Sequence, residues 1–243
     1  MNLVLEYIHY RWKAKQKSKF SSETSDRIKN CMTQSNVKLA FETELLAYRN
    51  AAKQENRTIL VQDFGAGSKK MGATRSIQNI YKNSRYTTPY QRILHNLVCE
   101  FNCKSILEMG TSLGFTSIYL SKANVSGKVT TIEACENTAA EAEKLFIELQ
   151  LTKIELIHST FLDYFEKREE NAFDLVFIDG HHDGKALLRY MDFLAKSCKA
   201  NCIFILDDIR WSKEMLAAWN ELISRPEFIF HHDLFRMGIL IMK

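Results

Sequence analysis

The chain has 243 residues, of which 46% are hydrophobic and 26% charged, and its formal net charge is +4. This composition is typical of one large globular domain, or of one domain with a small appendage, and it excludes a disordered chain, a collagen-like chain and a small disulfide scaffold. No apolar run approaches the roughly 18 residues that span a bilayer, and the first ten residues lack the charge order of a secretion signal. We therefore expect a cytoplasmic protein.

The basic excess lies within the first 35 residues, and the remainder of the chain is balanced in charge. Nucleic-acid-binding proteins usually carry a basic face on their main domain, so this distribution argues against a nucleic-acid partner. We interpret the basic arm as a solvated helix face; the alternative is a contact with an acidic partner or a membrane surface. Tyr7, Tyr10 and Trp12 on this arm are candidates for a homodimer contact or for a cover over a cleft.

Six cysteines are scattered along the chain, and two pairs have CxxxC spacing, Cys99 with Cys103 and Cys198 with Cys202. Neither pair has the CxxC spacing of a zinc site. Scattered cysteines of this kind are typical of buried thiols in a reducing compartment. We therefore expect free, buried thiols.

The first part of the chain is predicted to be mainly helical. Residues 1–58 show helical spacing of apolar and charged positions, and residues 59–64 form a short strand-like run. Residues 74–84 and 89–101 again have helical periodicity. We predict a helical N-terminal extension or lid with a basic arm over residues 1–88.

A basic, glycine-containing segment over residues 65–72 interrupts this extension. It is not a P-loop, because Gly67 and Gly72 are followed by Ala73 and Thr74 in place of Lys and Ser/Thr. Two interpretations stay open: an ordinary surface turn, which we favour, and a mobile lid that contacts substrate.

From residue 104 onward, short apolar runs alternate with helical periodicities. This alternation predicts βαβ units around a mostly parallel sheet, and continuous runs such as LVFI and IFIL predict strands that are buried on both faces. The predicted strands cover residues 105–109, 128–132, 154–157, 173–178 and 202–206.

The pattern changes after the last predicted helix. Residues 227–231 and 238–242 are two further strands with no room for a crossover helix between them, so they should pair antiparallel. The predicted fold is α/β: a Rossmann-like, seven-stranded, mostly parallel sheet with a terminal antiparallel strand pair, preceded by the helical N-terminal extension.

Candidate binding residues follow the predicted strands, because ligands of an open α/β sheet bind beyond the carboxyl ends of its strands. Gly110 and Gly114 follow the first strand and permit a tight turn with close backbone approach. The helix that begins there favours negative charge at its N-terminus. The second strand ends at Glu133, about twenty residues later, where an acid can accept hydrogen bonds from ribose hydroxyls.

Glu108 separates two cofactor classes that share such an acid. A dinucleotide site needs glycine at the first position of GxGxxG so that the backbone can approach a pyrophosphate. Glu108 stands at that position and would repel a pyrophosphate. A carboxylate instead suits a cationic, zwitterionic ligand such as S-adenosylmethionine (SAM).

These motifs resemble the class I SAM-dependent methyltransferases, and within them the metal-dependent small-molecule O-methyltransferases of the catechol and caffeoyl-CoA type and their bacterial relatives. The resemblance covers about residues 90–243, which implies a methyltransferase domain over residues 89–243 with a seven-stranded sheet and one reversed strand. It is carried by ILEMGTSLGFTS at 106–117, TIEAC at 131–135, FDLVFIDGHHD at 173–183 and FILDDIRWS at 204–212.

The resemblance also implies which residues hold SAM. Glu133 would bind the ribose, and Ala134 would lie next to the adenine. Ser159 and Thr160 fall where family members contact adenine, and Asp179 is a further candidate contact. The methionine side of SAM would be lined by Glu108, Gly110, Thr111 and Gly114.

A cluster of carboxylates is predicted where the fourth and fifth strands end. Asp179, Asp207 and Asp208 should meet there, and a divalent cation would relieve their repulsion. Oxygen ligands suit Mg²⁺, Mn²⁺ or Ca²⁺, and the resemblance implies that these three residues are metal ligands, although relatives commonly carry Asn at the position of Asp208. The alternatives are that Asp207 or Asp208 caps the next helix, or that Asp179 contacts only SAM.

The candidate catalytic residues are His182, His181 and Asp179. His182 falls where catechol-type relatives have a lysine, and a neutral imidazole near pH 7 can remove the proton of a hydroxyl. Histidines of loops are more often surface residues, so this role competes with a structural one. Trp211 is either a wall of the substrate pocket or an ordinary core aromatic.

The sequence therefore predicts a SAM-dependent methyltransferase that acts on a hydroxyl of a small molecule with divalent-metal assistance. One alternative is metal-independent N- or O-methylation, although Asp179-Gly180-His181-His182 in place of an Asn/Asp-Pro-Pro-aromatic run argues against base methylation. The other alternative is a non-catalytic SAM-binding regulatory subunit, which would have no need of clustered carboxylates.

Overall fold

The computed structural model describes residues 23–62, 73–84, 88–124, 126–167 and 172–243. Its strands form two sheets, an antiparallel pair from the N-terminal part and a large sheet from the remainder. The strands are β1 (Thr58–Val61), β2 (Ala73–Ser76), β3 (Ser105–Met109), β4 (Lys128–Glu133), β5 (Ile154–His158), β6 (Leu175–Ile178), β7 (Ile203–Leu206), β8 (Phe228–Asp233) and β9 (Gly238–Met242).

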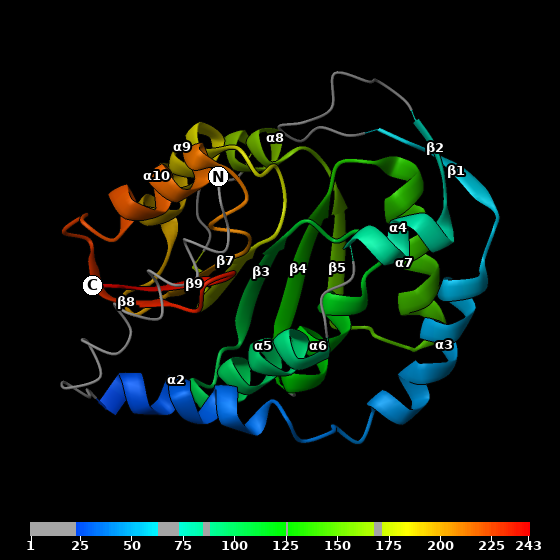
Figure 1. Cartoon of the computed structure of the whole chain (residues 1–243), viewed down its shortest axis with the longest axis horizontal. Coiled ribbons are helices and arrows are strands. Elements are labelled where there is room, and N and C mark those ends of the chain that lie inside the picture. Colours follow the sequence, from blue (N-terminus) through cyan, green and yellow to red (C-terminus); the bar gives the residue numbers. More distant parts are fainter. Residues whose placement is uncertain (1–22, 63–72, 85–87, 125, 168–171) are drawn as a thin grey trace.

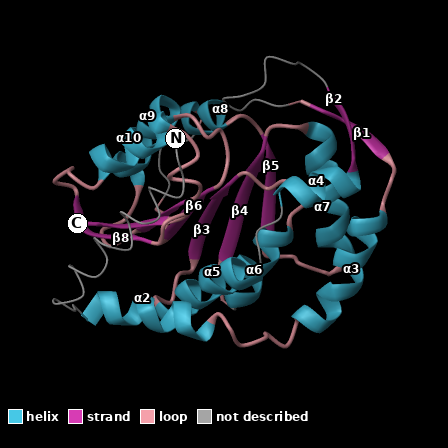
Figure 2. Cartoon of the chain, viewed as in Figure 1, coloured by secondary structure: helices cyan, strands magenta, loops and turns pink. Residues whose placement is uncertain are grey.

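Helices cover both faces of the large sheet (Figure 2). They are α2 (Glu23–Gln34), α3 (Glu42–Gln54), α4 (Ile77–Ser84), α5 (Thr88–Glu100), α6 (Phe115–Ala123), α7 (Glu136–Glu148), α8 (Phe161–Glu166), α9 (Gly184–Ser197) and α10 (Lys213–Leu222). The helices α8, α9 and α10 lie on one face, and α5 and α6 lie on the other (Figure 1).

The large sheet has the order β5-β4-β3-β6-β7-β9-β8. The first five of these strands run parallel, and β9 runs antiparallel to both β7 and β8. The predicted α/β fold, with seven strands and a terminal antiparallel pair, is confirmed. The strand order reverses direction between β3 and β6, which places a switch point at the carboxyl ends of these two strands.

Two local predictions need correction. Residues 74–84 were expected to be helical throughout, but β2 precedes α4 because residues 73–76 pair with β1. The second difference is α8, which the apolar periodicity did not indicate because it has only six residues. Its N-terminus is set by Thr160, whose hydroxyl accepts a hydrogen bond from the Asp163 amide at 3.2 Å.

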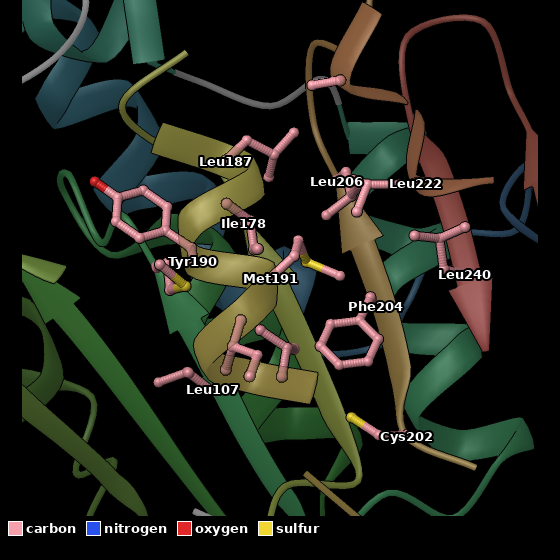
Figure 3. Packing of buried hydrophobic residues seen from close by; sticks show 14 of the residues in the cluster. Leu107, Ile178, Leu187, Tyr190, Met191, Cys202, Phe204, Leu206, Leu222 and Leu240 are labelled. Atoms are coloured by element: carbon pink, nitrogen blue, oxygen red, sulfur yellow. The ribbon is translucent and has the colours of Figure 1, made fainter. Parts of the chain in front are cut away.

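The parallel strands are buried on both faces because successive side chains point to opposite sides of the sheet. Leu107, Val176 and Phe204 pack under α9 and α10, as Figure 3 shows for Leu107 and Phe204. The alternate positions, such as Ile106 and Phe177, pack against α5 and α6. Burial on both sides explains the uninterrupted apolar runs of the sequence.

The helix α2 packs against α5 of the large domain, whereas α3 packs against α4 of the same extension and reaches the large domain through polar contacts. Glu42 of α3 is the polar centre of this contact. Its carboxylate accepts two hydrogen bonds from Arg92 at 2.7 and 2.6 Å and one from the Tyr119 hydroxyl at 2.9 Å. Burial alone would raise the pKa of Glu42, but these hydrogen bonds outweigh it and lower the pKa.

Several predictions concern residues outside the described ranges. These are the 65–72 segment and Tyr7, Tyr10 and Trp12 of the basic arm. The six cysteines all carry free thiols; four of them are buried as predicted, whereas Cys99 is exposed and Cys198 is half-buried. Burial raises the pKa of Cys103 to about 12, so this thiol is not reactive. Among the helices that the structure describes, none is long and apolar enough to cross a membrane.

The contact between α3 and the large domain should depend on Glu42. Replacing it (Glu42→Ala) leaves Arg92 largely buried without its carboxylate, so we expect a loss of about 3 kcal/mol in the free energy of unfolding. Urea denaturation measures this loss. Glu44→Ala on the exposed side of the same helix is the matched control and should change stability by less than about 0.5 kcal/mol; equal effects of the two variants would contradict the prediction.

Candidate active site

A cavity of about 640 Å³ opens at the carboxyl ends of the parallel strands, at the switch point between β3 and β6. Its size lies within the usual range of small-molecule sites. The walls come from the turn after β3, the end of β4 and the loops after β6 and β7, with Gln62 and Arg75 added by the N-terminal extension. Residues from most of the predicted motifs therefore face one space.

The turn after β3 depends on two glycines with positive φ angles, 108° at Gly110 and 78° at Gly114. A Cβ atom on Gly110 would lie 2.1 Å from the backbone oxygen of Asp179, so only glycine permits β3 and β6 to end this close together. A Cβ atom on Gly114 would lie 2.5 Å from the ring of Phe146. Gly110 and the following Thr111 line the cavity, whereas Gly114 lies behind it at the start of α6.

Glu108, at the end of β3, has a buried side chain that lies beside this turn and does not line the cavity. Its Oε2 accepts hydrogen bonds from Ser117 and from Thr131, which lies directly opposite on β4. The other carboxylate oxygen, Oε1, is buried and has no hydrogen-bond partner among the described residues. Burial raises the pKa of Glu108 to about 7 in spite of the two hydroxyl donors.

Glu133 is held in place by the backbone at the end of β4. Its Oε2 accepts a hydrogen bond from the Ser112 amide at 2.9 Å, and its Oε1 accepts one from the Cys135 amide at 3.0 Å. Each oxygen retains capacity for a further donor, and the residue faces the cavity. Burial raises the pKa of Glu133, and the backbone donors oppose that shift.

Ala134 and Thr160 line the cavity next to Glu133, together with Phe161 and Leu162. This part of the wall combines two backbone turns with apolar side chains, which suits a flat heteroaromatic ring. Ser159 does not line the cavity; its hydroxyl donates to the carbonyl of Thr160 at 3.0 Å. Of the three residues predicted on the adenine side, Ala134 and Thr160 line the cavity and Ser159 does not.

The structure brings together the three aspartates that follow β6 and β7. Burial and the neighbouring Asp207 raise the pKa of Asp179 well above its usual range. Asp207 itself is almost completely buried, and Asp208 beside it has a φ of 50°, a left-handed conformation that is uncommon for a residue with a side chain. The two aspartates do not cap α10, because Ser212 does so with a 3.1 Å hydrogen bond from the Met215 amide.

Arg236 is the residue that the sequence analysis missed. It lies in the turn between β8 and β9, and its Nε and Nη2 donate to the two carboxylate oxygens of Asp207 at 3.1 and 2.9 Å. The same Nε lies 3.1 Å from Oδ1 of Asp208. Since β9 pairs with β7, the β8–β9 turn must lie near the end of β7, and this topology is the signal that could have identified Arg236.

The ion pairs of Arg236 occupy residues that were predicted to bind a divalent cation. Both oxygens of Asp207 are already bound to Arg236, and its side chain has no exposed surface. In the part of the chain that the structure describes, no group of three or more His, Cys, Asp or Glu side chains is arranged to hold a metal. The residues present therefore do not fit a divalent cation in this conformation.

The two histidines after β6 differ in their surroundings, although both line the cavity. Nε2 of His182 lies 4.0 Å from Asp179 and 3.9 Å from Asp208, and its ring lies 5.6 Å from that of Trp211. Nδ1 of His181 is 2.5 Å from the Tyr190 hydroxyl. The side chain of Trp211 is largely exposed, so it is a wall residue of the cavity and the core-aromatic alternative is wrong.

The comparisons with known proteins agree with this geometry. Residues 107–209 match a family model described as a methyltransferase domain. The chain therefore contains a methyltransferase domain. The search of curated proteins found no match.

Solved structures share the fold of this methyltransferase at low identity. An O-methyltransferase from Bacillus cereus in complex with SAH is 20% identical, with a TM-score of 0.58 over 69% of this chain and 88% of that one. The O-methyltransferase TomG from Streptomyces achromogenes, in complex with SAM, is 19% identical, with a TM-score of 0.58 over 68% and 86%. Cofactor-bound Rv0187 from MTB is 17% identical, with a TM-score of 0.61 over 88% and 94%.

The buried Glu108 should make the stability of the methyltransferase pH-dependent. Its pKa of about 7 in the folded state lies above the ordinary value, so between about pH 4.5 and 7 the unfolded chain loses a proton that the folded chain keeps. The contribution of Glu108 to stability is present below this window and is lost as pH rises through it. We expect Glu108→Gln to be more stable than the natural chain at pH 8 by about 2–3 kcal/mol.

Urea denaturation at pH 5 and pH 8 measures this difference, which should shrink at the lower pH. Glu148→Gln on the exposed side of α7 is the control and should behave like the natural chain at both pH values. A difference between Glu108→Gln and the natural chain that stays constant over this range would contradict the prediction.

Proposed function

We propose that this methyltransferase transfers a methyl group from SAM to a hydroxyl oxygen of a small molecule. The observation that carries the proposal is Glu133, whose two oxygens are oriented by backbone amides toward the same cavity as the Gly110 turn. That pair of acceptors suits the two hydroxyls of a ribose. The similar structures from B. cereus and S. achromogenes, both O-methyltransferases, support the choice of oxygen as acceptor.

The residues that would hold SAM are Gly110, Thr111, Glu133, Ala134 and Thr160. When bound, SAM supplies a methyl group activated by a positively charged sulfur. The carboxyl groups around this space favour a cationic ligand over a pyrophosphate. Glu108, Gly114 and Ser159 would not contact SAM directly. Glu108 accepts a hydrogen bond from Ser117 of α6, and Gly114 is the residue before the first turn of α6. Ser159 donates a hydrogen bond within the loop before α8.

His182 is the better of the two candidate bases. Its Nε2 faces the cavity between Asp179 and Asp208, and a proton taken from the acceptor hydroxyl would be stabilised there by nearby carboxylates. His181 is instead engaged with the Tyr190 hydroxyl. Since methyl transfer is a single displacement, holding the acceptor in line contributes most of the catalysis, and Trp211 beside His182 offers a flat surface for that purpose.

The divalent cation that the sequence predicted, with Asp179, Asp207 and Asp208 as its ligands, is not part of this proposal. The ion pair of Arg236 with Asp207 and Asp208 supports a different role for these residues, which is developed below.

Cofactor binding tests the first half of the proposal. Isothermal titration calorimetry with SAH should give one site on the natural chain and no heat with NADH. Glu133→Gln should weaken binding by about 1–3 kcal/mol, or roughly 5- to 150-fold, because it replaces a charged acceptor of two hydroxyls. Gly110→Ala should abolish binding, and Glu148→Gln should leave it unchanged; tight uptake of NADH without SAH binding would overturn the cofactor.

Turnover tests the second half. With an acceptor found by screening catechol-like, sugar and lipid-head-group hydroxyls, His182→Ala should lower kcat by about 10²- to 10⁴-fold while the affinity for SAH is kept. The matched variant His181→Ala should have a smaller effect. SAH binding without methyl loss on any acceptor would favour the alternative of a regulatory subunit, and full activity of His182→Ala would remove it as the base.

A further inference from the structure

We propose that the guanidinium of Arg236 takes the place of a divalent cation in this protein. The inference concerns the charge balance of Asp179, Asp207 and Asp208, and it goes beyond the proposed methyl transfer. It predicts that the folded chain binds no divalent metal at these residues, because an arginine of the chain itself already compensates their charge.

The contacts of Arg236 support this role. Its Nε and Nη2 form a two-pronged ion pair with the two oxygens of Asp207, at 3.1 and 2.9 Å, and its Nε lies 3.1 Å from Asp208. A planar guanidinium matches a carboxylate in this fork geometry, and such pairs are among the strongest charge-assisted hydrogen bonds. One residue thus bridges two of the three predicted metal ligands.

The backbone holds Arg236 at this position. Its carbonyl accepts a hydrogen bond from the Ile209 amide at 3.0 Å, which ties the β8–β9 turn to the loop that carries the aspartates. Arg210 fixes the other side of the turn through two hydrogen bonds to Asp233, at 2.9 and 2.7 Å, and one to the Phe235 carbonyl at 2.7 Å. The guanidinium of Arg236 is therefore held by the backbone next to the carboxylates whose charge it compensates.

A divalent cation would have to displace this pair. Mg²⁺ requires nearly octahedral oxygen coordination and retains several waters. The side chain of Asp207 has no exposed surface, and each of its oxygens accepts from Arg236. A metal could reach Asp207 only if Arg236 moved away and water entered the space between the strand ends.

The position of Arg236 also has a consequence for the acceptor. Its side chain is 34% exposed, and it lines the cavity together with Asp208 and His182. If the proposed function holds, an acceptor oxygen that approaches His182 meets a fixed organic cation instead of a metal. Such a site favours an acceptor with a second oxygen, or an anionic group, that can accept from the guanidinium.

The experiment measures Mn²⁺ binding by electron paramagnetic resonance of the free ion, on the full chain with and without SAH. The natural chain should show no saturable binding up to about 1 mM, the weak end of protein sites for hard cations. Arg236→Met should bind one Mn²⁺ at least roughly tenfold more tightly than this limit of about 1 mM, because its three carboxylates lose the cation that compensates their charge. Mn²⁺ should also raise the Tm of this variant and leave the Tm of the natural chain unchanged.

Arg225→Met is the matched control, since it removes an arginine that is paired with Asp192 and Glu221, away from the three aspartates, and it should bind no Mn²⁺. Circular dichroism and SAH calorimetry show whether each variant is folded. If Arg236→Met does not fold, Arg236→Gln takes its place in the experiment. One tight Mn²⁺ site on the natural chain would overturn the proposal, and so would a folded Arg236→Met that binds no Mn²⁺. Failure of the proposed function would appear separately, as a natural chain that binds no SAH.

Discussion

The close approach of β3 and β6 is the constraint on which the site depends. Gly110 lies so near the backbone of Asp179 that no side chain fits between them. This contact brings the turn after β3 and the loop after β6 to the same edge of the sheet, where the strand order reverses. The cavity, the aspartates and both histidines take their positions from these two neighbouring strand ends.

The acidic residues at this edge are stabilised in three different ways. Glu108 is buried and accepts hydrogen bonds from hydroxyls, and Glu133 is oriented by backbone amides. Asp207 is paired with an arginine from a distant turn. Carboxylates this close would repel one another, so each needs a partner that stabilises it. The partner also determines whether the oxygens of a carboxylate stay available to bind a ligand.

The N-terminal extension contributes to the same site through a buried polar network. Gln91 of α5 accepts a hydrogen bond from Arg49 of α3 and donates one to the Thr116 hydroxyl at 3.3 Å. Gln91 and Thr116 both line the cavity. The extension is therefore connected to the turn that follows β3, and its own residues Gln62 and Arg75 complete the wall.

The sequence by itself determined the sheet and the positions of the acids at its edge. Continuous apolar runs indicate strands buried on both faces, and parallel strands bring their carboxyl ends together, so Glu133, Asp179 and Asp207 could be placed near one another without coordinates. Tertiary structure alone decided where side chains point and which distant residues meet. The side chain of Glu108 accepts a hydrogen bond from Thr131 and does not face the cavity. His181 contacts the Tyr190 hydroxyl, and Arg236 pairs with Asp207, 29 residues away in the sequence. These outcomes depend on packing between segments far apart in the chain, which periodicity along the sequence does not encode.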